Sequence, residues 1–350
     1  MSQDPVGSRV RAIRFEADGT IRFTDVARPD PGPDEVLVQV LAAGVCRTDL
    51  HLLHEVQSGR RDPLVPGHEI AGRITQVGRE VFMGSPGDVV GVHYEQPCGW
   101  CRHCRRKRTN LCQRGRSLGF DAQGGYAEFV VARQSTVLPL PPDLDPVDAA
   151  TLGCSGATAY HVVATLGEAE EDSTVVVVGA GGVGLAAIQV ARAQQARVLA
   201  IDPREAARKA ALDAGATAAA APDEAARALR EMAGEEGADV VADFVGTRES
   251  LERGRALLGY GGRLVVVAEG EGTQDPMPVT AANLVEGGRA YLGSYSSTIA
   301  DFARAIALAE SGLLRPLVTR REPLSKAPSV LGDLEAGKII GRAVLLPGTP

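Results

Sequence analysis

The sequence predicts an α/β protein in which a Rossmann-type, doubly wound parallel sheet follows a β-rich part. Three observations support this fold class. Val36, Val38 and Val40 recur at every second position, the period of a strand with one buried face. A continuous apolar run fills residues 174–178, which is typical of a buried parallel strand. Beyond it, strand-like and helix-like segments alternate, and this alternation indicates a sheet covered by helices on both faces.

The individual elements follow from the same periodicities, with turn markers such as the Pro-Gly-Asp at residues 86–88 between them. We expect strands at residues 36–40, 89–92, 127–131, 174–178, 197–201, 239–243, 263–267, 289–292 and 342–346. We expect helices at residues 185–195, 205–213 and 299–311. Periodicity alone does not decide whether the segment after Tyr295 extends the second sheet or returns to the first part.

Bulk composition restricts the functional class. The 350 residues are 44% hydrophobic, enough for two domains, and the net charge of −7 argues against general binding to nucleic acid or membrane surfaces. Residues 173–191 carry no charge, but four glycines interrupt them, so a strand, loop and helix fit better than a membrane span. The N-terminus has no apolar core of a signal peptide, so we expect a cytoplasmic protein.

Four of the six cysteines are bunched in a C-x2-C-x2-C-x7-C pattern. They are Cys98, Cys101, Cys104 and Cys112. Four thiolates can surround one zinc ion at about 2.3 Å. Disulfides are disfavoured without an export signal, and Gln113 stands where an iron–sulfur pattern has proline. The basic run at residues 105–108 raises the alternative of a nucleic-acid-binding zinc ribbon, but the chain is acidic overall. We predict a structural zinc lobe at about residues 95–115.

The other two cysteines, Cys46 and Cys154, are far apart in the sequence. Each alone is more often a small buried residue than a ligand, and His68 alone is more often a hydrogen-bonded structural histidine. Together, two cysteines and one histidine form the ligand set of a catalytic zinc whose fourth position is open.

A glycine-rich loop follows the apolar strand at residues 174–178 directly and opens a helix-like segment. It matches G-x-G-x-x-G with Gly179, Gly181, Gly182, Val183 and Gly184. Such a loop lets a pyrophosphate approach the free N–H groups of a helix N-terminus. Asp202 lies at the end of the next expected strand, where a carboxylate can accept hydrogen bonds from both hydroxyls of an adenosine ribose. Alone it would be a solvent-facing aspartate.

These pieces together resemble the zinc-containing medium-chain alcohol dehydrogenases over nearly the whole chain. Gly67-His68-Glu69, followed by Gly72, Gly78 and Val81, is similar to the zinc signature of that family. The resemblance implies a Rossmann domain inserted in a β-rich catalytic domain of the chaperonin-10 (GroES-like) fold. The implied boundaries are a catalytic domain at residues 1–154, an NAD-binding domain at 155–294, and a return to the catalytic domain at 295–350.

The resemblance also implies roles by position. It assigns the catalytic zinc to Cys46, His68 and Cys154, and the structural zinc to the four bunched cysteines. The further assignments are Asp49 as the partner of His68, Glu69 as the acid behind the metal, Thr48 and His51 as a proton relay, and Arg47 and Arg342 as contacts of the cofactor pyrophosphate. Thr48 and His51 are suited to proton transfer. A hydroxyl can donate one hydrogen bond while it accepts another, and an imidazole titrates near neutral pH.

The function that follows is reversible, NAD-dependent oxidation of an alcohol to an aldehyde or ketone. Polyol, amino-alcohol or acyl-CoA-linked secondary alcohol dehydrogenases on the same scaffold are the alternatives. Asp202 favours NAD over NADP, and we expect Arg204, which could serve a phosphate, to be solvated on the next helix. We expect no nucleic-acid or membrane partner, and a homotetramer, with a dimer as the alternative.

Overall fold

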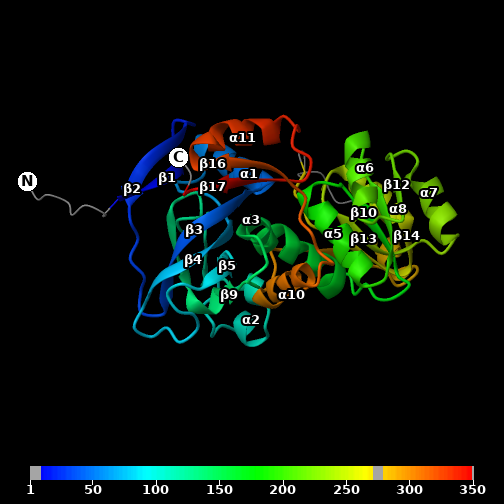
Figure 1. Cartoon of the computed structure of the whole chain (residues 1–350). Helices are drawn as coiled ribbons and strands as arrows, with labels where there is room; N and C mark the ends of the chain where they lie inside the picture. The colour runs from blue at the N-terminus through cyan, green and yellow to red at the C-terminus, as the bar shows by residue number, and fades with distance from the viewer. Residues whose placement is uncertain (1–8, 271–278, 349–350) are drawn as a thin grey trace, which may run out of the picture. The chain divides into compact units, whose positions relative to one another are not determined.

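The computed structural model describes residues 9–270 and 279–348 (Figure 1). The chain divides into two compact units. Residues 1–154 and 318–350 form the first unit, and residues 155–317 form the second. The second unit is thus inserted into the first, as the resemblance implied.

The second unit contains a six-stranded sheet in which all neighbouring strands are parallel. Its strands are β10 (Thr174–Val178), β11 (Arg197–Ile201), β12 (Ala218–Ala220), β13 (Ala238–Asp243), β14 (Leu258–Val266) and β15 (Ala290–Gly293). The spatial order is β12-β11-β10-β13-β14-β15. The order runs outward in both directions from β10 and β13, which is the topology of a doubly wound dinucleotide-binding fold.

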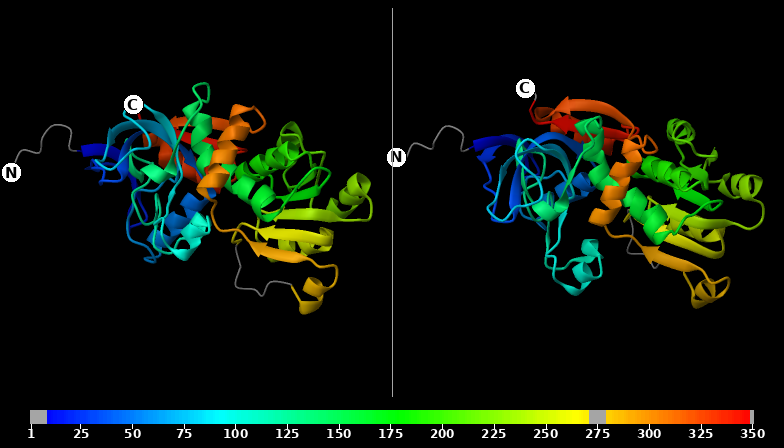
Figure 2. Two further views of the ribbon diagram at one scale, coloured as in Figure 1. Left: turned by 90° about the horizontal axis from the view of Figure 1, so that it is seen from below. Right: turned by 60° about the horizontal axis from the view of Figure 1, so that its bottom comes forward.

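Helices cover both faces of this sheet (Figure 2). The helical segments of the second unit are α4 (Ala157–Tyr160), the π-helical η4 (His161–Leu166), α5 (Gly182–Ala193), α6 (Glu205–Asp213), α7 (Ala225–Ala233), α8 (Arg248–Leu257), α9 (Ala281–Val285) and α10 (Ile299–Glu310). Val241 packs in one cluster with residues of α7 and α8, whereas Ala242 packs with Val162 of η4. Because neighbouring residues of a strand point to opposite faces, both faces are buried.

A buried aspartate joins two of these helical segments. Asp301, at the start of α10, is 3% exposed. Its Oδ2 lies 2.8 Å from His161 Nδ1 of η4, and its Oδ1 accepts a 2.6 Å hydrogen bond from Thr165. Thr298 donates to Oδ2 through both its backbone N–H and its hydroxyl. Burial alone would raise the pKa of Asp301, but the hydrogen bonds from His161, Thr165 and Thr298 outweigh it and lower the pKa to about 2.

We expect Asp301→Asn to lower the free energy of unfolding by about 2–3 kcal/mol near neutral pH, because its donors lose a charged acceptor. The folded pKa lies below the usual value of about 3.9, so the contribution is present above about pH 4 and is lost as the pH falls toward 2. Denaturant titrations across this range should show a shallower acid loss in the variant. An equal acid loss in both proteins would contradict the assignment.

The first unit is mainly antiparallel. Its strands are β1 (Arg9–Phe15), β2 (Ile21–Ala27), β3 (Glu35–Val45), β4 (Glu69–Val77), β5 (Val89–Val92), β6 (Glu95–Gln96), β7 (Arg116–Ser117), β8 (Phe129–Arg133), β9 (Val137–Pro139), β16 (Val318–Pro323) and β17 (Arg342–Leu346). The large sheet has the order β16-β17-β3-β4-β5-β9, with β8 also on β3. β3 pairs with β17, β4 and β8, so it occupies the centre of the unit.

The helical segments of the first unit are short. They are α1 (Arg47–Gln57), α2 (Arg102–Arg105), η1 (Thr109–Leu111), η2 (Gln134–Thr136), α3 (Pro146–Thr151), η5 (Leu324–Lys326) and α11 (Ala327–Glu335), and the π-helical turn η3 (Leu152–Gly156) follows α3. The antiparallel pairing of β17 with β3 answers what periodicity left open, because the tail does return to the first unit. It returns at Val318 rather than at residue 295, since α10 packs against α4 of the second unit.

Candidate active site

Three elements of the first unit bring Cys46, His68 and Cys154 together. Cys46 immediately precedes α1, His68 immediately precedes β4, and Cys154 lies in the π-helical turn η3. Their ligand atoms and one carboxylate oxygen of Glu69 all lie within 4.8 Å of one another, and all four residues are buried. π-helical turns are rare in proteins, and those that occur often lie at functional sites. The fold thus assembles the ligand set that the sequence pattern predicted.

The electrostatics of this group favour a bound cation. A hydrogen bond from Cys154 is the main cause that lowers the pKa of Cys46 well below its usual value; burial opposes it, and His68 and Arg342 add to it. Burial disfavours a charged His68, but Asp49 and Cys46 outweigh burial and raise its pKa to about 10. Two sulfurs and an imidazole form a donor set that zinc prefers, and these buried residues fit that ion.

Asp49 orients the histidine. His68 Nδ1 lies 3.2 Å from Asp49 Oδ1, which leaves Nε2 free to bind a metal. The other oxygen, Oδ2, accepts a 2.9 Å hydrogen bond from the backbone N–H of Cys46. A carboxylate behind a ligating histidine fixes its tautomer and raises its basicity. The structure therefore brings Asp49 beside His68, and its role behind a metal ligand stays a prediction.

Two glycines make room for this arrangement. Gly67 has φ +94°, and a Cβ there would collide with the ring of Tyr126. A Cβ on Gly44 would collide with the side chain of Glu69. The glycine of the Gly-His-Glu motif therefore has a steric reason as well as a conformational one.

Arg342 pairs with Glu69. Both side chains are buried, and Arg342 Nη2 donates to Glu69 Oε1. Sequence reasoning missed this pair, because it assigned Arg342 to the cofactor pyrophosphate. Arg47, the first residue of α1, is exposed. Contacts of either arginine with a cofactor stay predictions.

The two relay residues lie one helical turn apart at the start of α1. Thr48 is half-buried, and its Oγ1 lies 3.5 Å from Cys46 Sγ. His51 is exposed. The structure thus brings Thr48 to the ligand group and leaves His51 at the surface of the unit, an order that suits a path from the metal group to water.

The four bunched cysteines form a second group, whose sulfur atoms lie within 4.8 Å of one another. The Sγ–Sγ distances are 3.5 Å for Cys101–Cys104 and 3.9 Å for both Cys98–Cys104 and Cys101–Cys112. Four thiolates at 2.3 Å from one ion define a tetrahedron with edges of about 3.8 Å, whereas a disulfide needs about 2.05 Å. An iron–sulfur cubane would hold each thiolate on a different iron atom, farther apart. The distances fit one zinc ion.

We expect Cys104→Ala to lower the free energy of unfolding by about 3 kcal/mol or more, because it opens a closed structural metal site. His103→Ala is the matched control, since His103 lies beside Cys104 but outside the metal group. It should change stability by less than about 0.5 kcal/mol. Denaturant unfolding and metal content check both variants. If the Cys104→Ala protein keeps its stability and both metal ions, the lobe does not have the proposed structural role.

The glycine-rich loop lies between β10 and α5 of the second unit. Gly179 has φ +93°, and a Cβ on Gly184 would collide with the carbonyl oxygen of Gly179. The loop is therefore as tight as a dinucleotide-binding turn requires. Gly181 precedes the first turn of α5, and Gly182 and Val183 begin the helix, so their N–H groups lie at the helix N-terminus.

Asp202 follows β11 and is buried at the loop. Its Oδ2 accepts a 3.0 Å hydrogen bond from the backbone N–H of Ala180. Arg204 is exposed at the start of the next helix, as expected, but its side chain also binds Asp202. Arg204 precedes α6 as its N-cap, and its guanidinium donates to both oxygens of Asp202, at 3.1 and 3.2 Å. A buried carboxylate is stabilised by a nearby cation. The spacing of Asp202 and Arg204 in the sequence did not reveal this ion pair.

Sequence reasoning did not single out Tyr126, which lies beside Asp49. It is fully buried, and its hydroxyl donates a 2.6 Å hydrogen bond to Asp49 Oδ2. Burial, with the nearby Asp49 charge, raises the pKa of Tyr126 well above its usual value, so the hydroxyl stays a donor. No periodicity or motif in the sequence marks this residue, because its importance arises only from contacts with distant segments.

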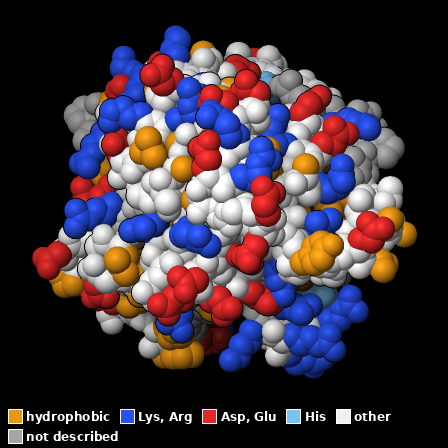
Figure 3. Space-filling model, turned by 90° about the vertical axis from the view of Figure 1, so that its right-hand side faces the viewer, with side chains coloured by type: hydrophobic (Ala, Val, Ile, Leu, Met, Phe, Trp, Pro, Cys, Tyr) orange, Lys and Arg blue, Asp and Glu red, His pale blue; other side chains and the backbone are white. Residues whose placement is uncertain are grey.

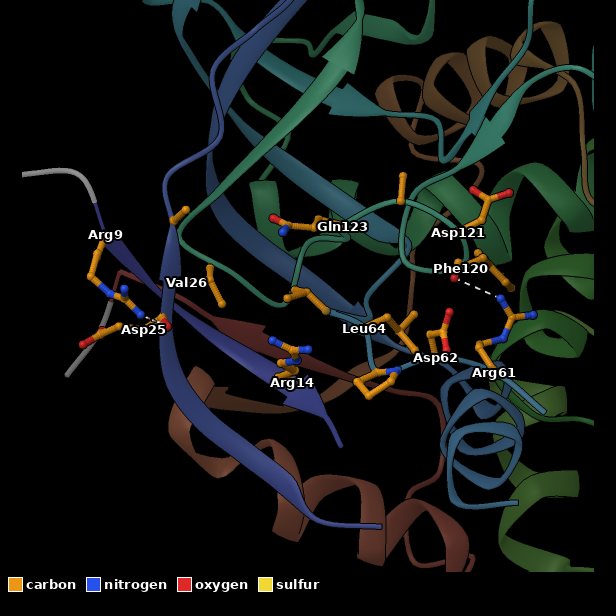
Figure 4. Close-up of a pocket in the computed structure, with 14 residues that line it drawn as sticks. Arg9, Arg14, Asp25, Val26, Arg61, Asp62, Leu64, Phe120, Asp121 and Gln123 are labelled. Atoms are coloured by element: carbon orange, nitrogen blue, oxygen red, sulfur yellow. Dashed lines mark hydrogen bonds between the residues drawn. The ribbon is translucent and has the colours of Figure 1, made fainter. Parts of the chain in front are cut away.

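A separate pocket of about 620 Å³ lies in the first unit (Figure 4). Its charged lining residues are Arg9, Arg14, Arg61, Asp25, Asp62 and Asp121. The arginines and aspartates balance in charge, and Arg61 already donates to Glu55 and to the carbonyl oxygen of Phe120. None of the metal-group residues lines this pocket.

The surface has a mixed charge. Figure 3 shows acidic and basic side chains interleaved over most of one face, with a group of Lys and Arg side chains at its lower right. Among residues 9–270 and 279–348, none of the helices is long and apolar enough to cross a membrane.

Comparisons with known proteins agree with this geometry. Residues 32–142 match the family described as alcohol dehydrogenase GroES-like domain, and residues 182–311 match the zinc-binding dehydrogenase family. An NAD-dependent alcohol dehydrogenase of Sulfurisphaera tokodaii is 35% identical, over 97% of this chain and 100% of that protein. A D-arabinose 1-dehydrogenase (NADP(+)) of Saccharolobus solfataricus is 30% identical, over 93% of this chain and 94% of that protein.

A solved structure shows the same fold. The crystal structure of the alcohol dehydrogenase from Aeropyrum pernix has a TM-score of 0.87 at 30% identity and covers 96% of this chain and 100% of that chain. The fold, the two cysteine-rich groups and the matches over nearly the whole length agree with one another. The chain therefore belongs to the zinc-dependent medium-chain alcohol dehydrogenase family.

Proposed function

We propose that this protein is an NAD-dependent zinc alcohol dehydrogenase that interconverts an alcohol with its aldehyde or ketone. The observation that carries the proposal is the buried set of Cys46, His68 and Cys154, which offers three zinc ligands from one unit. These three residues would hold a zinc ion whose remaining position stays open. Such an ion would supply Lewis-acid chemistry at the substrate oxygen.

The chain's own residues divide the remaining tasks. Asp49 holds His68 in one tautomer through its contact at Nδ1. Thr48, beside the ligand group, receives the alcohol proton at Oγ1 and passes its own proton toward His51 at the surface. The exposed position of His51 lets it exchange that proton with water. The glycine-rich loop and Asp202 would bind the pyrophosphate and adenosine ribose of NAD, and the bound cofactor would supply hydride-transfer chemistry.

We propose that the protein is a cytoplasmic homotetramer with no nucleic-acid or membrane partner. Tyr260, Leu284 and Val285 of the second unit are 84%, 45% and 79% exposed. Apolar side chains exposed to this degree support a subunit interface there. Light scattering at several concentrations measures the assembly.

The test is a panel of primary, secondary and aromatic alcohols with the zinc-loaded enzyme and NAD, followed by the absorbance of reduced nicotinamide. Sugars and polyols belong in the panel, because the Saccharolobus relative is named for D-arabinose, and they test the runner-up substrate class. Protein stripped of metal is the control. If no alcohol reduces NAD with zinc-loaded enzyme, the proposal fails.

A further inference from the structure

We propose that Tyr126 is a positioning residue for the catalytic metal, acting through Asp49 on the ligands Cys46 and His68. The inference rests on the proposed zinc site but concerns a residue outside the ligand set. Tyr126 is not one of the candidate metal ligands, and it is 77 residues from Asp49 in the sequence.

The side chain of Tyr126 acts on Asp49. Its hydroxyl donates to Asp49 Oδ2 at 2.6 Å, and the same oxygen accepts the backbone N–H of Cys46 at 2.9 Å. With Oδ2 held by these two donors, Oδ1 lies 3.2 Å from His68 Nδ1, which is an ion-pair contact rather than an aligned hydrogen bond. Without the hydroxyl, only the Cys46 N–H would hold Oδ2, and the carboxylate could rotate away from the imidazole. The orientation of His68 therefore depends on Tyr126.

The backbone of Tyr126 acts on the segment that carries His68. Its N–H donates to Pro66 O at 3.0 Å, and the N–H of Gly125 donates to Gly67 O at 2.7 Å. The ring occupies the space next to Gly67, where a Cβ would collide with it. Tyr126 thus connects two ligand-bearing segments that are not neighbours in sequence, the start of α1 and the residues before β4.

The hydrogen bond between Tyr126 and Asp49 is buried, because both side chains have 0% exposure. It is charge-assisted because its acceptor is a carboxylate. Outer partners of metal ligands typically change metal affinity or activity by about 10- to 100-fold when they are removed. The hydroxyl alone should account for the lower end of this range, since Asp49 itself remains in place.

The experiment compares Tyr126→Phe with the unaltered protein by the rate at which a chelator removes each zinc. The structural lobe is an internal reference in the same molecule. We expect the catalytic zinc to leave about 10-fold faster in Tyr126→Phe, while the lobe zinc leaves at an unchanged rate. Tyr291→Phe is the matched control, because the Tyr291 hydroxyl is buried without a hydrogen-bond partner among the described residues; it should change neither rate.

A double-mutant cycle with Asp49→Asn tests the route. If Tyr126 acts through Asp49, the double variant should lose zinc no faster than Asp49→Asn alone. Additive rates would overturn the route, and unchanged zinc loss in Tyr126→Phe would overturn the proposal. A merely structural role would lower stability and leave the zinc rates of the folded protein unchanged.

A second measurement needs no substitution at Tyr126. With fluorotyrosine incorporated throughout, the fluorine resonance of Tyr126 should shift when the catalytic zinc is removed, and that of Tyr291 should not. If the fluorine resonance of Tyr126 does not shift when the catalytic zinc is removed, the proposal is also overturned. Zinc retention and resonance shifts do not depend on catalysis, so a failure of the proposed alcohol oxidation is distinguishable from a failure of this inference.

Discussion

Cys46→Ala should lower kcat/KM for alcohol oxidation by at least about 10³-fold. The variant removes one of the three proposed zinc ligands from the buried group that also contains Glu69. Lewis-acid stabilisation by a metal is worth several kcal/mol, and each 1.36 kcal/mol is tenfold in rate, so a loss of about 4 kcal/mol gives this factor. The zinc content should fall from two ions per chain to one. Steady-state kinetics and elemental analysis measure both effects.

The fold should survive this change. The hydrogen bond from Cys46 to Asp49 comes from the backbone N–H, so alanine keeps it, and the lost sulfur costs only about 1–2 kcal/mol of stability. Cys104→Ala provides the opposite pattern, with stability lost at the structural lobe and the catalytic ligands intact. A Cys46→Ala protein that keeps both zinc ions and its activity would disprove the ligand assignment.

Cofactor choice should depend on Asp202. We expect the unaltered enzyme to prefer NAD over NADP by about 10²-fold or more in kcat/KM. The carboxylate can accept charge-assisted hydrogen bonds from the ribose, each worth about 1.5–3 kcal/mol, and 1.4 kcal/mol is tenfold. A phosphate in place of one hydroxyl removes a donor and adds a like charge. Asp202→Gly should lose most of the preference.

The structure sharpens this expectation through Arg204. Because Arg204 donates to both oxygens of Asp202, a ribose must compete with it for the carboxylate. Asp202→Gly releases that guanidinium, which should then favour the phosphate of NADP, so we expect Asp202→Gly with Arg204→Ala to use NADP less well than Asp202→Gly alone. Asp213→Ala on the exposed face of α6 is the control. Equal use of both cofactors by the unaltered enzyme would contradict the placement of Asp202 at the ribose.

Strong local patterns were predictable from the sequence. β10 and β11 have the bounds that the apolar runs predicted, because a strand buried on both faces needs continuous apolar residues. β14 begins at Leu258 rather than at residue 263, since the glycines at residues 261–262 interrupt the apolar pattern. Gly261 has φ +72°, and the pairing with β13 shifts register across this segment. The cysteine spacing predicted that the four sulfur atoms lie close together, because all four cysteines lie in one short segment.

Contacts between distant segments were not predictable. The pairing of Arg342 with Glu69 and of Tyr126 with Asp49 depends on how strands far apart in sequence meet. The return at Val318 depends on the packing of α10 against α4, and an amphipathic helix does not reveal which sheet or helix it covers. The resemblance supplied the roles of Asp49 and Thr48, which residue spacing alone would not have assigned.

The short distances between the lobe sulfur atoms also bear on oxidation of the protein after the metal is lost. Cys101 and Cys104 have sulfurs 3.5 Å apart. An oxidant that removes two electrons can join them once they approach to about 2.05 Å in the dihedral geometry of a disulfide. A bound ion occupies the lone pairs that an oxidant would attack, so it protects these thiolates as well as holding the loop. Once the ion has left, air oxidation competes with its return. Preparations depleted of metal should therefore recover fully only when a reductant is present before zinc is added back.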